Sequence, residues 1–148
     1  MTRRLDLAID SNLDDVCLIG LVINEICEFA RIPPVDAYQI ELCVVEAVNN
    51  SIRHAYGCRP GNIVRVAVEV GEGELRFAVQ DTGKPMPARL AASLADRSRA
   101  LEFDESDVKS LPEGGMGLAI AARVMDQMNY STSDGCNSLV LTKRIPHT

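Results

Sequence analysis

A carboxylate and an amide stand four residues apart in a segment with the apolar content of a buried helix. Glu46 and Asn50 occur in VVEAVNNSIRHAYG, residues 44–57, and side chains at i and i+4 project from the same helix face. An ionised carboxylate in an apolar setting is strongly disfavoured unless water or a partner compensates it. The pair therefore lies either on a solvated helix edge, the more common arrangement for such a pair taken alone, or against a polar pocket.

A second carboxylate comes at the end of a predicted strand, in VQDTGKP, residues 79–85. Asp81 at such a position could accept a hydrogen bond from an exocyclic amine such as adenine N6, and Gly83 would let a ligand approach the backbone closely. The same D-x-G pattern also forms ordinary turns, which is its more frequent role when it stands alone.

Three glycines, Gly114, Gly115 and Gly117, open a predicted helix in EGGMGL. Free amides at a helix N-terminus attract anions, and glycines allow a phosphate to lie against those amides. The stretch is not a P-loop, because no Lys-Ser/Thr pair follows it and no strand directly precedes it. A flexible hinge explains these glycines equally well.

The elements that position these residues follow from hydrophobic periodicity and from capping and turn residues. The expected elements, in chain order, are a strand over 3–10, a helix over 13–30 with Ser11 as its N-cap, a helix over 36–56 ended by Gly57, a hairpin over 62–81, a short helix over 87–97, a polar loop over 98–113, a helix over 114–128, and a strand, turn and strand over 130–145. Because several strands adjoin through hairpins, an α/β domain of the α+β sandwich type is expected, with a mixed, mostly antiparallel sheet and helices on one face.

Composition favours a single domain, residues 1–148, and narrows its partners. The chain is 47% apolar and 24% charged, with three Phe, three Tyr and no Trp. A net charge of −6 and few aromatic side chains argue against a nucleic-acid surface, which needs basic and stacking groups. The N-terminus lacks a signal-peptide core and no stretch approaches the length of a membrane span, so a cytoplasmic protein is expected.

The cysteines are scattered and form no C-x-x-C motif. The five are Cys17, Cys27, Cys43, Cys58 and Cys136. We expect buried, small apolar residues in a reducing compartment rather than disulfides or zinc ligands.

The three polar stretches occur in a specific order: an acid and an Asn on a helix, D-x-G at a strand end, a long polar loop, then G-x-G-L opening a helix. This order resembles the N, G1 and G2 boxes of the Bergerat-type ATP-binding fold shared by histidine kinases, gyrase B, Hsp90 and MutL. Within that superfamily, the chain resembles the anti-sigma factor and serine-protein kinase family in three stretches, VVEAVNNSIRHAYG, VQDTGKPMP and GGMGLAIAARVMDQM. The resemblance covers nearly the whole chain.

The resemblance implies a role for each position. Asn50 matches the residue that ligates Mg²⁺ bridging the ATP phosphates, and an amide oxygen suits this hard ion. Glu46 matches the proposed general base that takes the proton from a serine hydroxyl, and Asp81 matches the aspartate that reads adenine. The remaining positions that the resemblance assigns to ATP binding are Gly83, Met86, Gly115, Gly117 and Leu118.

Two further features bear on this assignment. Residues 98–113 match the ATP lid, in which Lys109 or Arg99 could add positive charge near the γ-phosphate. The first glycine box is commonly D-x-G-x-G, and Pro85 replaces its second glycine, which stiffens the turn and removes an N–H donor. ATP binding remains the expectation. His54 lies in the nucleotide-binding helix itself and is not expected to be a phosphoacceptor.

The function implied by the resemblance is that of an anti-sigma factor and ATP-dependent serine-protein kinase. Such a protein sequesters a sigma factor and phosphorylates an anti-anti-sigma antagonist of the STAS type, and the family suggests a homodimer formed through helices and the first strand. Direct contact with nucleic acid or a membrane is not expected. Two alternatives stay open: a catalytically weak or inactive ATP-binding partner-switching module, which Pro85 favours, and a detached histidine-kinase catalytic domain.

Overall fold

A five-stranded sheet carries the described part of the chain, which comprises residues 1–95 and 115–145 of the computed structural model. The strands are β1 (Arg3–Asp10), β2 (Ile63–Val70), β3 (Glu74–Asp81), β4 (Gln127–Ser133) and β5 (Cys136–Arg144). Their spatial order is β1-β2-β3-β5-β4, and all four neighbouring pairs are antiparallel. The predicted α+β class with a mostly antiparallel sheet is therefore confirmed.

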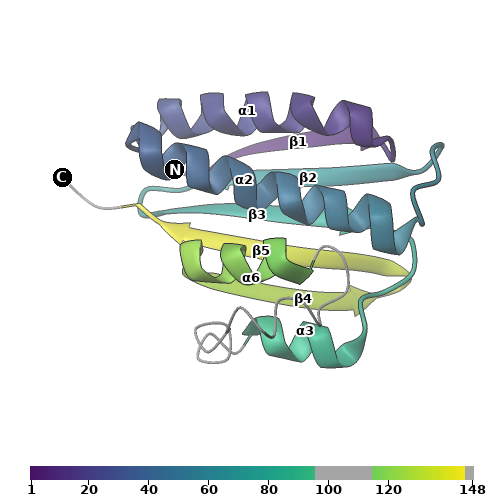
Figure 1. The fold of residues 1–148 in the computed structure, drawn as a ribbon. Helices are drawn as coiled ribbons and strands as arrows, with labels where there is room; N and C mark the ends of the chain where they lie inside the picture. The colour runs from purple at the N-terminus through teal and green to yellow at the C-terminus, as the bar shows by residue number, and fades with distance from the viewer. Residues whose placement is uncertain (96–114, 146–148) are drawn as a thin grey trace.

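Helices cover one face of this sheet, and the main ones lie side by side across it (Figure 1). The α-helices of the described residues are α1 (Val16–Phe29), α2 (Pro34–Asn50), α3 (Ala88–Ala95) and α6 (Gly115–Val124). A short 3₁₀ turn, Leu13–Asp15, precedes α1, and a π-helical turn, Ser51–Ala55, continues α2. Helix α3 lies beside β4 at the far edge of the sheet (Figure 1). No helix within the described ranges is long and apolar enough to cross a bilayer.

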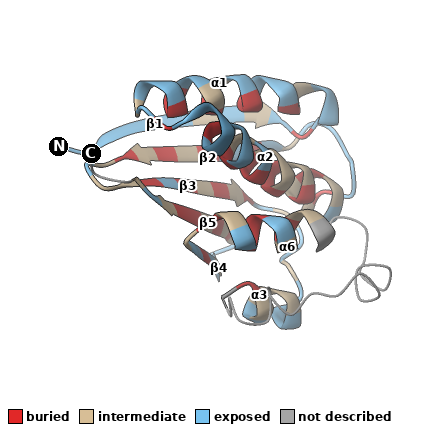
Figure 2. Ribbon diagram, turned by 60° about the vertical axis from the view of Figure 1, so that its left-hand side comes forward, coloured by how far each residue is buried: buried red, intermediate tan, exposed pale blue. Residues whose placement is uncertain are grey.

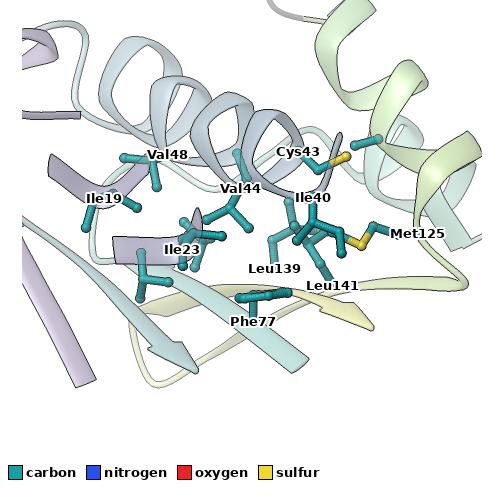
Figure 3. Close-up of a cluster of buried hydrophobic side chains, with 14 of the residues drawn as sticks. Ile19, Ile23, Ile40, Cys43, Val44, Val48, Phe77, Met125, Leu139 and Leu141 are labelled. Carbon is teal, nitrogen blue, oxygen red and sulfur yellow. The ribbon is translucent and has the colours of Figure 1, made fainter. Parts of the chain in front are cut away.

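The core fills the space between the helices and the sheet, because each element turns an apolar face inward. Along β2 the valines at alternate positions are buried, and in β3 the side chain of Phe77 is fully buried. Figure 2 shows the buried faces of α1 and α2 turned toward the strands. Ile23 and Val44 meet the sheet residues in the cluster of Figure 3. Burying each large aliphatic side chain contributes about 1.5–3 kcal/mol, so this aliphatic core fixes how the helices sit on the sheet.

The second predicted helix changes geometry where its polar residues end. Asn50 closes α2, and the next five residues, Ser51–Ala55, form a π-helical turn. Gly57 then adopts φ +60°, which glycine tolerates and which ends the helix, as predicted. Single π-helical turns are wider than the α-helix and are frequent at functional sites, and this one changes which side chains share a face.

The predicted cap of the first helix is wrong by one residue. Asn12 is the cap, because its side chain accepts a hydrogen bond from the Asp14 amide at 3.0 Å. The side chain of Ser11 is instead buried, donating to the Arg59 carbonyl and accepting from the Asn62 amide at 3.1 Å. Ser11 therefore ties the end of β1 to the turn before β2, a contact that local sequence does not reveal.

The predicted helix over 114–128 is also wrong at its C-terminal end. Helix α6 ends at Val124 and β4 already begins at Gln127. Strand β5 imposes this ending, because Lys143 donates to the Val124 carbonyl at 2.8 Å and the Arg144 amide donates to the Asp126 carboxylate at 2.6 Å. These contacts come from residues that follow in the sequence, so apolar periodicity extended the helix too far.

The cysteines agree only in part with the prediction. All five are free thiols, as expected, and the side chains of Cys27 and Cys43 are buried in the core. Cys17 and Cys58 are exposed, so the prediction of buried cysteines is wrong for these two, and Cys136 is half-buried. Cys17 points outward because it lies on the solvent side of α1, one residue after the buried Val16.

Candidate functional site

A cavity of about 230 Å³ opens between α2, the end of β3 and the start of α6. Its lining residues are Ala47, Asn50, Ser51, His54, Ala55, Val79, Asp81, Lys84, Pro85, Met86, Pro87, Leu90, Leu118, Tyr130 and Leu139. Most of these side chains are apolar, and a few polar groups stand among them. Apolar walls with a small number of fixed polar groups are typical of small-molecule sites.

The cavity brings together two of the polar residues singled out from the sequence. Asn50 is the last residue of α2, Asp81 is the last residue of β3, and both line the cavity. They are 9% and 8% exposed respectively. A carboxylate and an amide among apolar walls are the kind of polar groups that orient a bound small molecule, so this cavity could recognise a polar ligand.

The other predicted contact residues divide into two groups. Met86 and Leu118 line the cavity, whereas Gly83 packs against the end of the π-helical turn. A Cβ at position 83 would overlap the Ala55 carbonyl oxygen and lie 2.6 Å from the Ala55 carbonyl carbon. Gly83 is therefore required by a close approach of two backbone segments, and its predicted contact with a ligand stays a prediction. Gly115 begins α6.

The turn after β3 is held by hydrogen bonds from nearly all its amides. The Thr82 amide donates to the Tyr56 hydroxyl at 2.8 Å, and the Lys84 amide donates to the Ala55 carbonyl at 2.9 Å. The Met86 amide donates to the Tyr130 hydroxyl at 2.8 Å. Pro85 has no N–H group, so it leaves no amide of this turn without an acceptor. Its presence is compatible with the turn and with the cavity that it lines.

Glu46 faces a different hollow from Asn50, although one helical turn separates them. It lines a groove of about 620 Å³ between α2 and α6, together with Arg53 and Gly117. A Cβ at Gly117 would overlap the Glu46 carboxylate, so the glycine makes room for this acid. The groove also exposes Tyr38 and Ile120. The two polar residues predicted to share one face of this helix thus line two different hollows, Asn50 the cavity and Glu46 the groove.

The thiol of Cys43, which interacts with Glu46, is unreactive. Burial is the main cause that raises the pKa of Cys43 to about 12, with Lys143 opposing the shift and the Glu46 carboxylate adding to it. The thiolate is the reactive form of cysteine, so a thiol with this pKa stays protonated and does not act as a nucleophile. Chemistry in this region rests on the carboxylate and amide groups.

Three polar side chains that build the site are not marked by any motif in the sequence. Asn137 of β5 donates to the Asp81 carboxylate at 2.7 Å. The hydroxyls of Tyr56 and Tyr130 accept hydrogen bonds from backbone amides of the turn after β3. The Asn137 side chain is buried, and its strand pairs with β3. A lone Asn or Tyr carries no motif, and only the pairing of β5 with β3 brings Asn137 to Asp81.

The described residues offer few side chains that could bind a metal ion. Within residues 1–95 and 115–145, no group of three or more His, Cys, Asp or Glu side chains is placed to hold a metal ion. Asn50 offers an amide oxygen, which fits an ion that takes most of its ligands from phosphates and water. This donor set is compatible with Mg²⁺ brought in with a nucleotide and not with a closed all-protein metal site.

Known proteins are similar to this chain in sequence and in fold. The chain is 30% identical over 102 residues to the anti-sigma F factor of Pasteuria penetrans, an alignment that spans 68% of the chain but only 63% of that relative. It is 23% identical over 143 residues to the serine-protein kinase RsbW of Staphylococcus aureus strain MRSA252, which covers 95% of the chain and 86% of the relative.

A solved structure supports the same architecture. A chain in the crystal structure of the SiaB–SiaC complex from Pseudomonas aeruginosa superposes with a TM-score of 0.60 at 18% identity, covering 94% of this chain and 88% of that one. At this identity the similarity establishes the fold alone. Residues 9–143 match the family described as Histidine kinase-like ATPase domain. The chain therefore belongs to the histidine kinase-like ATPase domain family.

Proposed function

We propose that this protein is an ATP-dependent serine-protein kinase that also sequesters a sigma factor. The observation that carries the proposal is the meeting of Asn50 and Asp81 at one cavity, at the ends of α2 and β3. A carboxylate suits the exocyclic amine of adenine, and an amide oxygen suits a phosphate-bound cation. The cavity therefore has the two polar groups that the two ends of ATP require.

The base would enter the cavity and the phosphates would extend toward α6. Val79, Leu118 and Leu139 provide apolar surface for the faces of a purine. The cavity of about 230 Å³ is smaller than the roughly 300–1,000 Å³ of typical small-molecule sites. The triphosphate would therefore lie outside it, toward the α6 N-terminus, where the first amides of a helix have no partner within that helix and the dipole favours anions.

Asn50 would hold Mg²⁺ through its amide oxygen. When bound, the ion neutralises charge on the phosphates, which is most of what phosphoryl transfer requires from a site. The position of Asn50 at the end of α2, beside the π-helical turn, directs it into the cavity while Glu46 faces the groove.

Glu46 would act as the general base toward a serine hydroxyl that approaches along the α2–α6 groove. The hydroxyl proton passes to the Glu46 carboxylate as the serine oxygen bonds to the γ-phosphorus. The bond from that phosphorus to the bridging oxygen of the leaving diphosphate breaks, and ADP departs. In this proposal the nucleotide binds in the cavity and the acceptor serine in the groove, which agrees with the placement of Asn50 and Glu46 in different hollows.

The names of the relatives support the proposed partners. Anti-sigma F factor is the name of one relative, and serine-protein kinase RsbW is the name of another. We propose a sigma factor as the sequestered partner and a STAS-type antagonist as the phosphorylated one. We also propose a cytoplasmic, single-domain protein.

A homodimer is part of the proposal, with α1 and β1 as its interface. Leu18, Leu21 and Phe29 of α1 are 54%, 64% and 61% exposed, and Leu5 of β1 is 40% exposed. Exposed apolar side chains gathered on neighbouring elements are typical of association surfaces. Leu21→Glu is expected to shift the protein toward monomer in analytical ultracentrifugation.

Calorimetry with Mg-ATP tests nucleotide binding, with Asn50→Ala and Asp81→Asn as the site variants. Removing Mg²⁺ with EDTA should weaken ATP binding by the wild type and should have little further effect on Asn50→Ala. Asp126→Asn is a matched control for Asp81→Asn, because Asp126 lies outside this cavity. An absence of binding by the wild-type chain would refute the proposal.

Phosphotransfer is tested with a STAS-domain antagonist and labelled ATP. The expected product is acid-stable phosphoserine, with transfer falling by roughly 10²–10⁴-fold in Glu46→Gln while ATP affinity is retained. Acid-labile phosphate on the partner would instead indicate the chemistry of a histidine kinase.

A non-catalytic ATP-binding module is the second candidate function. The observation that favours it is the placement of Glu46 outside the nucleotide cavity, in the groove. This candidate predicts Mg-ATP binding that regulates partner affinity, with no phosphate on the partner. Undiminished transfer in Glu46→Gln would likewise remove Glu46 from the mechanism.

A further inference from the structure

We infer that Asn137 is the positioning residue that sets the base preference of the cavity, an inference that rests on the proposed nucleotide site. Asn137 of β5 is 2% exposed and stands directly opposite Asp81 in the pairing of β3 with β5. Its Nδ2 donates to Asp81 Oδ1 at 2.7 Å and to the Gly83 carbonyl at 2.9 Å. One side chain thus holds both ends of the turn that bears the candidate base-reading carboxylate.

The orientation of the Asn137 amide is fixed by its surroundings. The Gly83 carbonyl can only accept a hydrogen bond, so the Asn137 atom that faces it must be the donor Nδ2. On the other side, the Thr132 hydroxyl donates to Asn137 Oδ1 at 2.9 Å. The hydrogen-bond chain therefore runs in one direction, from Thr132 through Asn137 to Asp81.

This direction determines what Asp81 can recognise. Its Oδ1 accepts from Asn137 and also from the Gly83 amide at 3.1 Å. These two donors hold the carboxylate plane in place and leave Oδ2 as the oxygen available to a ligand. A fixed acceptor pairs with the amine of a 6-amino purine and leaves the carbonyl of a 6-oxo purine unpaired against an oxygen. Asn137 therefore favours ATP over other purine nucleotides without touching the base.

Removing the Asn137 amide would release this arrangement. The Gly83 carbonyl would lose its partner, and the Asp81 carboxylate would be free to rotate between orientations. Binding that depends on the 6-amino group would weaken, whereas apolar contact with the purine ring would not. The base preference is therefore the binding property that depends on Asn137.

The test compares the full chain with Asn137→Leu by calorimetry, using ATP, GTP and the triphosphate of purine riboside, which has no group at position 6. ATP binding is expected to weaken by roughly tenfold, which corresponds to the loss of about one hydrogen bond to a charged group. Binding of the purine riboside triphosphate should stay within about twofold, so the preference for the amine falls. Asn129→Leu on β4 is the matched control and should leave the preference unchanged.

The thermal midpoint of Asn137→Leu shows whether that variant folds. If it folds poorly, a second variant tests the inference. Thr132 is exposed on the edge strand, and Thr132→Val removes only the donor to the Asn137 carbonyl. It should lower the ATP preference by about threefold, in the same direction. An unchanged preference in the folded variants overturns the inference while leaving the proposed function intact. Failure of the wild type to bind ATP overturns both.

Discussion

The Glu46 carboxylate occupies the space in which a side chain at Gly117 would begin. A Cβ at position 117 would lie 2.9 Å from Glu46 Cδ and 3.0 Å from its Cγ. The glycine at position 117 therefore leaves room for the Glu46 side chain where α6 lies against α2. Glu46 and Gly117 are 71 positions apart in the sequence, and they pack against each other in the groove that both line.

Gly117→Ala is expected to displace the Glu46 side chain while leaving the fold intact. The side chain is flexible, and alanine favours the helix by about 1 kcal/mol over glycine, so the free energy of unfolding should change by less than about 1 kcal/mol. Phosphotransfer should fall by roughly 10²-fold, because the base is moved. In a Glu46→Ala background the same substitution should have no further effect on transfer, and a full additional loss there would contradict the coupling.

Gly83→Ala should behave differently, because the obstacle is backbone. A Cβ there would overlap the Ala55 carbonyl, which the π-helical turn and the bond from the Lys84 amide hold in place. We expect the free energy of unfolding to fall by about 1–3 kcal/mol, as for overpacked cores, and ATP affinity to fall with it. Urea denaturation and calorimetry measure the two effects. A stable variant with normal affinity would show that the two segments can separate freely.

Much of the fold could be predicted from local sequence. The alternation of Leu5, Leu7 and Ile9 predicted β1 with its observed bounds, and the valines of residues 63–70 predicted the first strand of the hairpin. These patterns succeed because side-chain alternation reports directly which face of a strand is buried. The end of α6 could not be predicted, because Lys143 and Arg144 set it from a strand that follows.

In the candidate site, too, some residues could be predicted from local sequence and others depend on contacts between distant segments. Glu46, Asn50 and Asp81 stand out in the sequence because they belong to polar stretches that follow one another in a specific order, although each alone has a more common structural role. Asn137 does not stand out, and its two acceptors are 54 and 56 positions away. The separation of Glu46 from Asn50 into two hollows also required the structure, because helical spacing alone placed them on one face. The predicted lid, residues 98–113 with Arg99 and Lys109, lies outside the described residues.

The buried thiols predict a loss of stability in alkaline solution. Burial, with a contribution from Glu41, raises the pKa of Cys27 from 9.0 to about 11, and burial with Glu46 raises that of Cys43 to about 12. Above pH 9 the unfolded chain loses these protons while the folded chain keeps them. The free energy of unfolding contributed by both thiols is therefore present in full below pH 9 and decreases as the pH rises toward 11 and 12.

Urea denaturation at pH 8 and pH 10 checks this prediction. Cys43→Val should show a smaller decrease between the two pH values than the wild type, because one of the shifted groups is gone. Cys58→Ser, which changes an exposed thiol, should decrease as much as the wild type. Equal slopes in all three proteins would show that other groups govern the alkaline transition.

Tyr56→Phe should loosen the turn after β3 and thereby weaken nucleotide binding. The Tyr56 hydroxyl accepts from the Thr82 amide at 2.8 Å and donates to the Ile63 carbonyl at 2.8 Å, with the side chain buried. Phenylalanine keeps the ring in the core but leaves both backbone groups without this partner. The free energy of unfolding should fall by about 1–3 kcal/mol, the cost of unpaired buried polar groups.

The matched control for this change is Tyr38→Phe, because Tyr38 is 58% exposed and lies on α2 away from the cavity. Its stability and ATP affinity should match those of the wild type. In Tyr56→Phe, amide hydrogen exchange should accelerate at Thr82, since its N–H loses the acceptor that protects it. ATP affinity should fall as the turn gains freedom, because Asp81 begins that turn and binding would have to order it again. Faster exchange with unchanged affinity would show that the turn does not position the carboxylate.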